Sequence, residues 1–156
     1  MMDVEKRLEE LGYSLPVAPE ESGNYISLKE FCGSLVYVSG TGGDSPTFSM
    51  TGTVGKDLTI EQGYQAAAAC VLNILAAFKQ KYGSLNRIKS FVKLLVFVAS
   101  SSDFYLQPKV ANGASDLLVQ LFGESVGKPA RSAIGVSVLP DHIPVEIECI
   151  IELNEP

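Results

Sequence analysis

An arginine and a glutamate near the C-terminal end are the strongest candidates for chemistry in this sequence. Arg131 lies on a predicted strand with the small residues Ala133 and Gly135 on its own face, so there is room above its side chain. A guanidinium suits carboxylate recognition because its planar fork donates two parallel hydrogen bonds. Glu146 lies on the next predicted strand, where a carboxylate could hold or deprotonate a water molecule. The pair suggests a small-carboxylate site, and the alternative is an exposed strand edge with an arginine facing solvent.

Residues 128–152 predict two half-buried strands joined by a short turn that contains Pro140 and Pro144. The prediction rests on alternation with a period of two, which is typical of strands with one buried face. The first strand places Ser132, Ile134, Val136 and Val138 opposite Arg131, Ala133, Gly135 and Ser137. The second places Val145, Ile147, Cys149 and Ile151 opposite Glu146, Glu148, Ile150 and Glu152.

The spacing within this stretch predicts a site that one chain cannot complete. Arg131 lies about eight residues before the Leu139-Pro140 turn, and Glu146 follows that turn. If the two strands run antiparallel, these residues lie roughly 20 Å apart along them at about 3.3 Å per residue. One small ligand cannot contact both. We therefore expect a site at an interface, formed by Arg131 of one subunit and Glu146 of its neighbour.

The other elements are predicted from caps and hydrophobic periodicity. Asp3 can cap a short helix that Gly12 ends, and Thr59 with Gln62 forms a capping box for a long helix that ends at Gly83. Ser100 to Asp103 offer caps for a second long helix that ends at Gly123, with Pro108 in its first turn or at a kink. The buried stripe of the first long helix is predicted as Ala67, Cys70, Val71, Ile74, Leu75 and Phe78. Strands are predicted at residues 35–40, 49–55 and 88–99, the last one central and covered on both faces.

This order of elements predicts an α/β (α+β) sandwich, in which two helices pack on one face of a mixed sheet. The other face would then carry apolar side chains that no helix covers. Another subunit is the simplest cover for it.

The length, net charge and composition of the chain limit the classes of protein to which it can belong. The chain has 156 residues, enough for one domain, and its net charge of −6 argues against broad contact with nucleic-acid phosphates. No apolar run is long enough to span a membrane, and the charged N-terminus is unlike a signal peptide. Cys32, Cys70 and Cys149 lie in apolar surroundings without ligand spacing, which predicts buried thiols, no metal site and a reducing, cytoplasmic setting.

Several motifs together resemble the YjgF family, also called the Rid (reactive intermediate deaminase) or endoribonuclease L-PSP family. They are Pro129-Ala130-Arg131-Ser132, Leu139-Pro140 and the acid-rich Val145-Glu146-Ile147-Glu148. Upstream, Tyr25, the strand end Val38-Ser39-Gly40, Asp103-Phe104 and Asn112 are similar to the family's pattern. The resemblance implies a family domain over residues 23–156 after a helix and loop extension at residues 1–22. It also implies a chorismate-mutase-like fold, assembled as a homotrimer with ligand clefts between subunits.

The resemblance further implies hydrolysis of 2-imino or enamine acids to 2-oxo acids and ammonia, without a metal or cofactor. Arg131 would bind the substrate carboxylate and Glu146 would position the attacking water. Ser39 and the backbone near Ala133 would bind the imine, and Tyr25 would close the pocket. Asn112 would also belong to the substrate-binding residues. For Tyr25 and Asn112 the alternatives are structural, with Tyr25 packed at a strand end and Asn112 on a helix surface.

Two other functions stay open at this stage. The family often has a cysteine where this chain has Ala133, so the protein could bind a small carboxylate without turning it over. RNA cleavage is the third hypothesis. The one histidine, His142, lies in a predicted turn and cannot form a His–His acid/base pair, and the acidic balance repels RNA.

Overall fold

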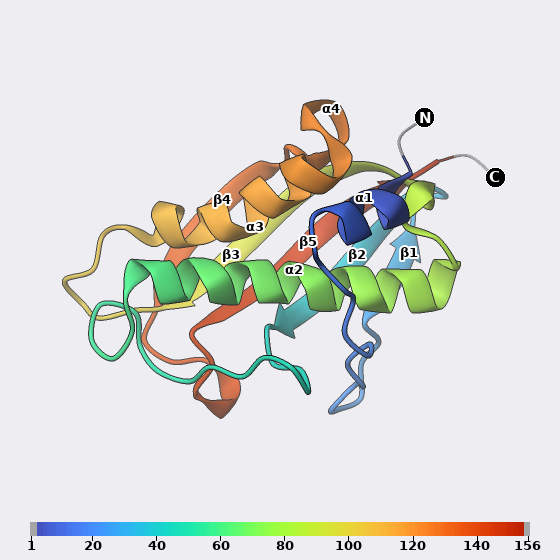
Figure 1. Cartoon of the computed structure of the whole chain (residues 1–156). Coiled ribbons are helices and arrows are strands. Elements are labelled where there is room, and N and C mark those ends of the chain that lie inside the picture. Colours follow the sequence, from blue (N-terminus) through green and yellow to red (C-terminus); the bar gives the residue numbers. More distant parts are fainter. Residues whose placement is uncertain (1–2, 155–156) are drawn as a thin grey trace.

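The computed structural model describes residues 3–154, which form a five-stranded mixed sheet with two long helices over one face (Figure 1). The order across the sheet is β1-β2-β5-β3-β4, in which β4 runs parallel to β3 and the other pairs are antiparallel. The strands are β1 (Leu28–Phe31), β2 (Leu35–Gly42), β3 (Ile88–Ala99), β4 (Ala130–Val136) and β5 (Val145–Leu153). The helices are α1 (Val4–Glu10), α2 (Ile60–Tyr82), α3 (Gln107–Phe122) and α4 (Glu124–Gly127), with short 3-10 turns at Leu85–Arg87 and Pro140–His142. The predicted fold class is confirmed.

Helix α2 begins and ends where its sequence signals predict. The amide of Gln62 donates to the Thr59 hydroxyl at 3.2 Å, and the amide of Thr59 donates to the Gln62 side chain at 2.9 Å. These two bonds satisfy amides that a helix start leaves without partners. The helix ends at Gly83, whose φ of +83° suits a residue without a Cβ. The predicted apolar stripe is buried from Ala67 to Phe78.

Helix α3 begins later than the sequence predicts. The expected caps at Ser100 to Asp103 are not used, and α3 begins at Gln107, directly before Pro108. A proline fits the first turn of a helix because that position needs no amide donor. The side chain of Gln107 instead donates back to Phe104 O at 2.7 Å and to the Ser100 hydroxyl at 3.2 Å. The prediction that Gly123 ends this helix is confirmed.

Two further predictions are wrong. Residues 49–55 do not form a strand. Only Val54 makes isolated bridges there, where its amide donates to Ala99 O and its carbonyl accepts from Ser101 N. Cys32 is exposed in the turn between β1 and β2, where its φ is +51°, whereas Cys70 and Cys149 are buried as expected. The sequence analysis also did not find β1 or α4, which are too short to show a periodic pattern.

The face of the sheet opposite the helices carries apolar side chains that no described element covers. In Figure 1 both long helices lie on the near side of the sheet. The register places Phe97 beside Ile134 and Glu146, and Tyr37 beside Ile150, on the far side. Ile134 is 43% exposed and Tyr37 is 41% exposed. The helices therefore cover one face of the central β3, and residues 3–154 of one chain leave its other face open. Within the same residues, no helix has the length and apolar character that crossing a membrane requires.

The contact between α2 and α3 requires a glycine. A Cβ on Gly113 would overlap the backbone of Tyr64, including its carbonyl oxygen, which cannot rotate away. Gly113→Ala should therefore lower the free energy of unfolding by about 2 kcal/mol, although alanine has the higher helix propensity. Denaturant unfolding measures the change.

The control is Gly23→Ala, because a Cβ on Gly23 meets only the Tyr25 ring at an ordinary 3.5 Å. We expect this variant to change the free energy by less than about 0.5 kcal/mol. Equal stability of the two variants would contradict the close packing of α2 on α3.

Candidate functional site

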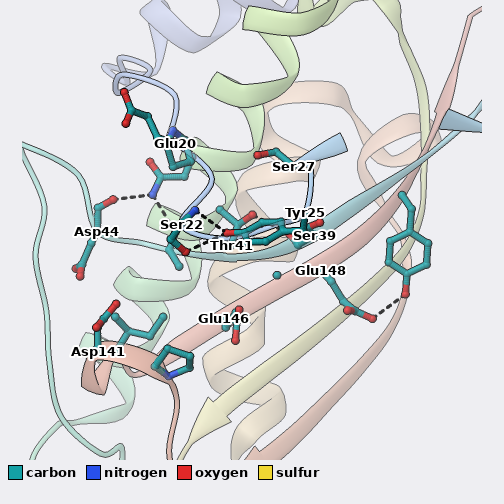
Figure 2. Close-up of a pocket in the computed structure, with 17 residues that line it drawn as sticks. Glu20, Ser22, Tyr25, Ser27, Ser39, Thr41, Asp44, Asp141, Glu146 and Glu148 are labelled. Carbon is teal, nitrogen blue, oxygen red and sulfur yellow. Dashed lines mark hydrogen bonds between the residues drawn. The ribbon is translucent and has the colours of Figure 1, made fainter. Parts of the chain in front are cut away.

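Three of the predicted site residues come together in a cleft at one end of β2 and β5. Tyr25, Ser39 and Glu146 all line this cleft, whose volume is about 680 Å³ (Figure 2). Glu146 projects from β5, opposite Gly42 of β2. The remaining walls come from the segment before β1, the loop after β2 and the turn before β5. They are lined by Pro19, Glu20, Ser22, Ser27, Tyr37, Gly40, Thr41, Gly42, Asp44, Asn73, Pro140, Asp141, Ile143 and Glu148.

The carboxyl group of Glu146 lies over Gly40. The β2–β5 register shifts between Val38 and Thr41, and Gly40 lies within this irregularity. A Cβ on Gly40 would overlap the Glu146 carboxyl group, so glycine leaves the space that the carboxyl group fills. In the sequence Gly40 appears only as part of a strand end. Nothing in the residues around it indicates that the Glu146 carboxyl group approaches it so closely.

Hydrogen bonds hold Ser39 and Tyr25 at the rim of the cleft. The hydroxyl of Ser39 donates to Ile26 O at 2.7 Å, which leaves its oxygen lone pairs as acceptors. The hydroxyl of Tyr25 lies 3.3 Å from the Ser22 hydroxyl and accepts from the Ser22 amide at 3.4 Å. Tyr25 is 48% exposed, so it forms a wall of the cleft and is not packed in the core.

The carboxyl group of Glu146 is poised to take up a proton. Its pKa is raised above the usual 4.5, first because burial disfavours the charged form and second because the charge of Glu148 lies nearby. Glu148 accepts a hydrogen bond from the Tyr37 hydroxyl at 2.8 Å, whereas Glu146 has no hydrogen bond or ion pair to any residue in 3–154. A half-buried carboxylate with a raised pKa and no partner can act as a general base toward water.

The other three predicted site residues form a second group at the β4 edge of the sheet. Nη1 of Arg131 donates to Asn112 Oδ1 at 2.8 Å and to the Ser115 hydroxyl at 3.0 Å, and Nη2 donates to Pro108 O at 3.4 Å. Ala133 lies two residues further along β4, on the same face. Helix α3 therefore orients the guanidinium group while some of its five N–H donors remain available. The sequence analysis missed Ser115, although its i+3 spacing from Asn112 on a helix could have found it.

The two groups point to opposite faces of the sheet. β3 lies between β4 and β5, and its Leu94 is paired with Arg131 on one side and with buried Cys149 on the other. Arg131 thus shares the helix-covered face. Glu146 is paired with Phe97, on the open face. The register places Arg131 level with Cys149, so Glu146 is offset by three residues along the strands, roughly 10 Å, and by two strand spacings across the sheet. The two Cα atoms are therefore about 14 Å apart, less than the roughly 20 Å expected from the sequence.

The cleft also contains acidic residues that the sequence analysis missed. Glu20, Asp44 and Asp141 line it together with Glu146 and Glu148, and no described lysine, arginine or histidine does so. Three separate loops supply the additional carboxylates, so no local spacing could have revealed them. Residues 3–154 hold no group of three or more His, Cys, Asp or Glu side chains arranged to bind a metal ion.

Comparisons with known proteins identify the family. The sequence pattern of the family described as Endoribonuclease L-PSP matches residues 16–153. Protein TCP17 of Trypanosoma cruzi is 43% identical, over 97% of this chain and 94% of that protein. Two solved structures are also similar over 97% of this chain. Atu1372 of Agrobacterium tumefaciens, a protein of unknown function, has a TM-score of 0.88 at 40% identity over 92% of its length. A candidate endoribonuclease from Shewanella oneidensis has a TM-score of 0.91 at 31% identity over its full length, 100%. The chain therefore belongs to the endoribonuclease L-PSP (YjgF) family, as its motifs indicate.

The contact between Arg131 and α3 can be tested by a double-mutant cycle. Asn112→Ala should lower the free energy of unfolding by about 0.5–1 kcal/mol, because it removes a hydrogen bond to a charged group at a partly exposed site. In an Arg131→Ala background the same substitution should have almost no effect. Denaturant unfolding of the four proteins gives the coupling.

Gln120→Ala is the control, since Gln120 is an exposed residue of the same helix. It should be additive with Arg131→Ala. Additive energies for Asn112→Ala would instead show that α3 does not hold the guanidinium group.

Proposed function

We propose that this protein hydrolyses 2-imino acids to 2-oxo acids and ammonia at a cleft shared by two subunits of a homotrimer. The main observation behind the proposal is that the candidate residues of one chain form two separate groups. Arg131 and Glu146 of one chain lie on opposite faces of the sheet, so both can contact one small substrate only if they come from different chains.

Charge complementarity supports a neighbour's contribution to each site. The described lining of one chain's cleft carries five carboxylates and no cationic side chain, so it would repel a carboxylate substrate. Arg131 lies on β4, which is an edge strand. A neighbour that docks this edge at the cleft would supply the missing positive charge and cover apolar residues such as Ile134 of the open face.

The proposed reaction uses Arg131, Glu146, Ser39 and one water molecule, and it requires no cofactor. Arg131 binds the substrate carboxylate, as its fork geometry favours. Glu146 accepts a proton from water as the water oxygen bonds to the imine carbon. Glu146 returns that proton to the nitrogen, which gives a tetrahedral intermediate with one hydroxyl and one amino group. The hydroxyl then passes its own proton through Glu146 to the nitrogen as the C–N bond breaks, so ammonia leaves and the carbon becomes the carbonyl of a 2-oxo acid. Ser39 donates its own proton to Ile26 O, so it would accept a hydrogen bond from the imine nitrogen rather than donate one.

One observation favours a second candidate function, the binding of a small carboxylate without turnover. Ala133 provides no thiol beside Arg131, where the family often has a cysteine. The backbone near Ala133 can still bind the imine end, so the deaminase proposal relies on that backbone and on Glu146. RNA cleavage is supported less well, because the cleft is acidic and the chain has one histidine.

The direct test is turnover on a panel of 2-imino acids that an amino-acid oxidase generates in the reaction mixture. The wild type should speed the release of 2-oxo acid, and Arg131→Ala should lower kcat/KM at least 100-fold, since a bidentate charged contact is lost. Light scattering should show the same trimer for both proteins. An intact wild-type trimer with no acceleration on any substrate would favour the carboxylate-binding function.

The pH dependence tests the role of Glu146. A general base must be ionised, so kcat/KM should fall as the pH drops through the raised pKa of Glu146. Glu148→Gln removes a neighbouring negative charge that raises this pKa. The acid limb of the pH–rate profile should therefore move to lower pH.

The matched control is Glu152→Gln, on the same face and strand but further from Glu146, which should leave the acid limb in place. If the acid limb of the pH–rate profile stayed at the same pH in Glu148→Gln, Glu146 would not be the group whose titration controls kcat/KM.

A further inference from the structure

We propose that the cleft selects 2-imino acids whose side chain carries a positive charge. This inference rests on the proposed deaminase function and names its substrate class. Arg131 from the neighbour and Glu146 account for the carboxylate and the reacting carbon, which every 2-imino acid has. The remaining walls must then discriminate between side chains.

These walls carry uncompensated negative charge. Of the five carboxylates, those of Glu20, Asp141 and Glu146 have no hydrogen bond or ion pair to any residue in the described part of the chain. Asp44 accepts from Met50 N at 3.3 Å and Glu148 accepts from the Tyr37 hydroxyl at 2.8 Å, and neither partner is charged. One guanidinium group from the neighbour would offset only one of these five charges. A cationic side chain would reduce the remaining negative charge and an anionic one would increase it.

A buried amide in the same cleft points independently to a hydrogen-bond donor on the ligand. Asn73 of α2 lines the cleft and is only 2% exposed. Its side-chain nitrogen donates to Gly42 O at 2.8 Å and to Asp44 O at 2.9 Å, so both of its donors are used. Its Oδ1 accepts no hydrogen bond from residues 3–154, so this oxygen stays available to a donor group on a ligand. An ammonium or guanidinium group supplies such a donor.

The arrangement of the carboxylates suits a long side chain. In the view of Figure 2, Glu20, Asp44 and Asp141 all lie to the left of Glu146, spaced from the top of the picture to the level of Glu146. A substrate whose reacting carbon is at Glu146 could therefore extend its side chain toward these three carboxylates. The cleft volume of about 680 Å³ lies within the usual range for small-molecule sites, so a ligand of arginine size can fit.

Part of this selectivity would come from the N-terminal segment before β1, in which the family match begins at residue 16. Glu20 belongs to the loop that follows α1, and residues of this N-terminal segment, including Leu8 and Leu15, pack on the core. The segment is thus held in place while it adds a carboxylate to the cleft. This gives the segment before β1 a role in choosing the substrate.

The test compares the 2-imino acids derived from arginine and from citrulline, which have nearly the same shape but carry a charged guanidinium and a neutral ureido group. We expect the wild type to have at least a 10-fold higher kcat/KM for the arginine-derived substrate, and the ratio to fall with rising salt. The double variant Glu20→Gln/Asp141→Asn should reduce the ratio to about 3-fold or less. Glu61→Gln, which removes one negative charge at the start of α2 outside the cleft, should keep the ratio.

A binding measurement separates this inference from the proposed function. Calorimetry with the corresponding 2-oxo acids needs no turnover. Tighter binding of the guanidinium compound by the wild type, lost in the double variant, would support the inference even if no substrate were hydrolysed. Equal affinities, or equal kcat/KM values in a protein that hydrolyses both substrates, would overturn it and leave the deaminase proposal standing.

Discussion

The alternation of side chains along a β-strand is the constraint on which the rest of this structure depends. Because β3 separates β4 from β5, and because side chains alternate between the two faces, Arg131 is fixed on the helix side and Glu146 on the open side. A shift of one residue in either register would reverse this and bury a charge or expose the core. The core that fixes the register therefore also keeps the two groups apart within one chain.

The same constraint shapes the electrostatics of the cleft. Glu146 lies over Gly40, within the irregular part of β2, where burial and Glu148 raise its pKa and no described cation lowers it. A carboxylate with a raised pKa is suited to accept a proton. It cannot bind an anionic substrate by itself, because the site also needs a positive charge for the substrate carboxylate. The missing charge and the uncovered apolar face both lie on the open side of the sheet, so one neighbouring subunit could supply both.

The sequence predicted the elements with strong local signals and missed those set by distant contacts. The capping box at Thr59 and the alternation in β5 are local, and both are confirmed. The predicted start of α3 was wrong because Pro108 favours a position in the first turn of the helix, and this preference outweighed the potential N-caps at Ser100 to Asp103. The insertion of β3 between β4 and β5 and the gathering of Glu20 and Asp141 depend on the whole fold. No pattern of residues adjacent in sequence could have shown them.

Subunit complementation tests the shared cleft most directly. Arg131→Ala and Glu146→Gln proteins, each inactive alone, would be mixed in equal amounts, unfolded and refolded together. If each cleft takes Arg131 from one subunit and Glu146 from the next, random assembly leaves both residues intact in about a quarter of the clefts, and about a quarter of the wild-type turnover should return. A mixture that forms trimers and stays inactive, while refolded wild type regains activity, would contradict the shared cleft.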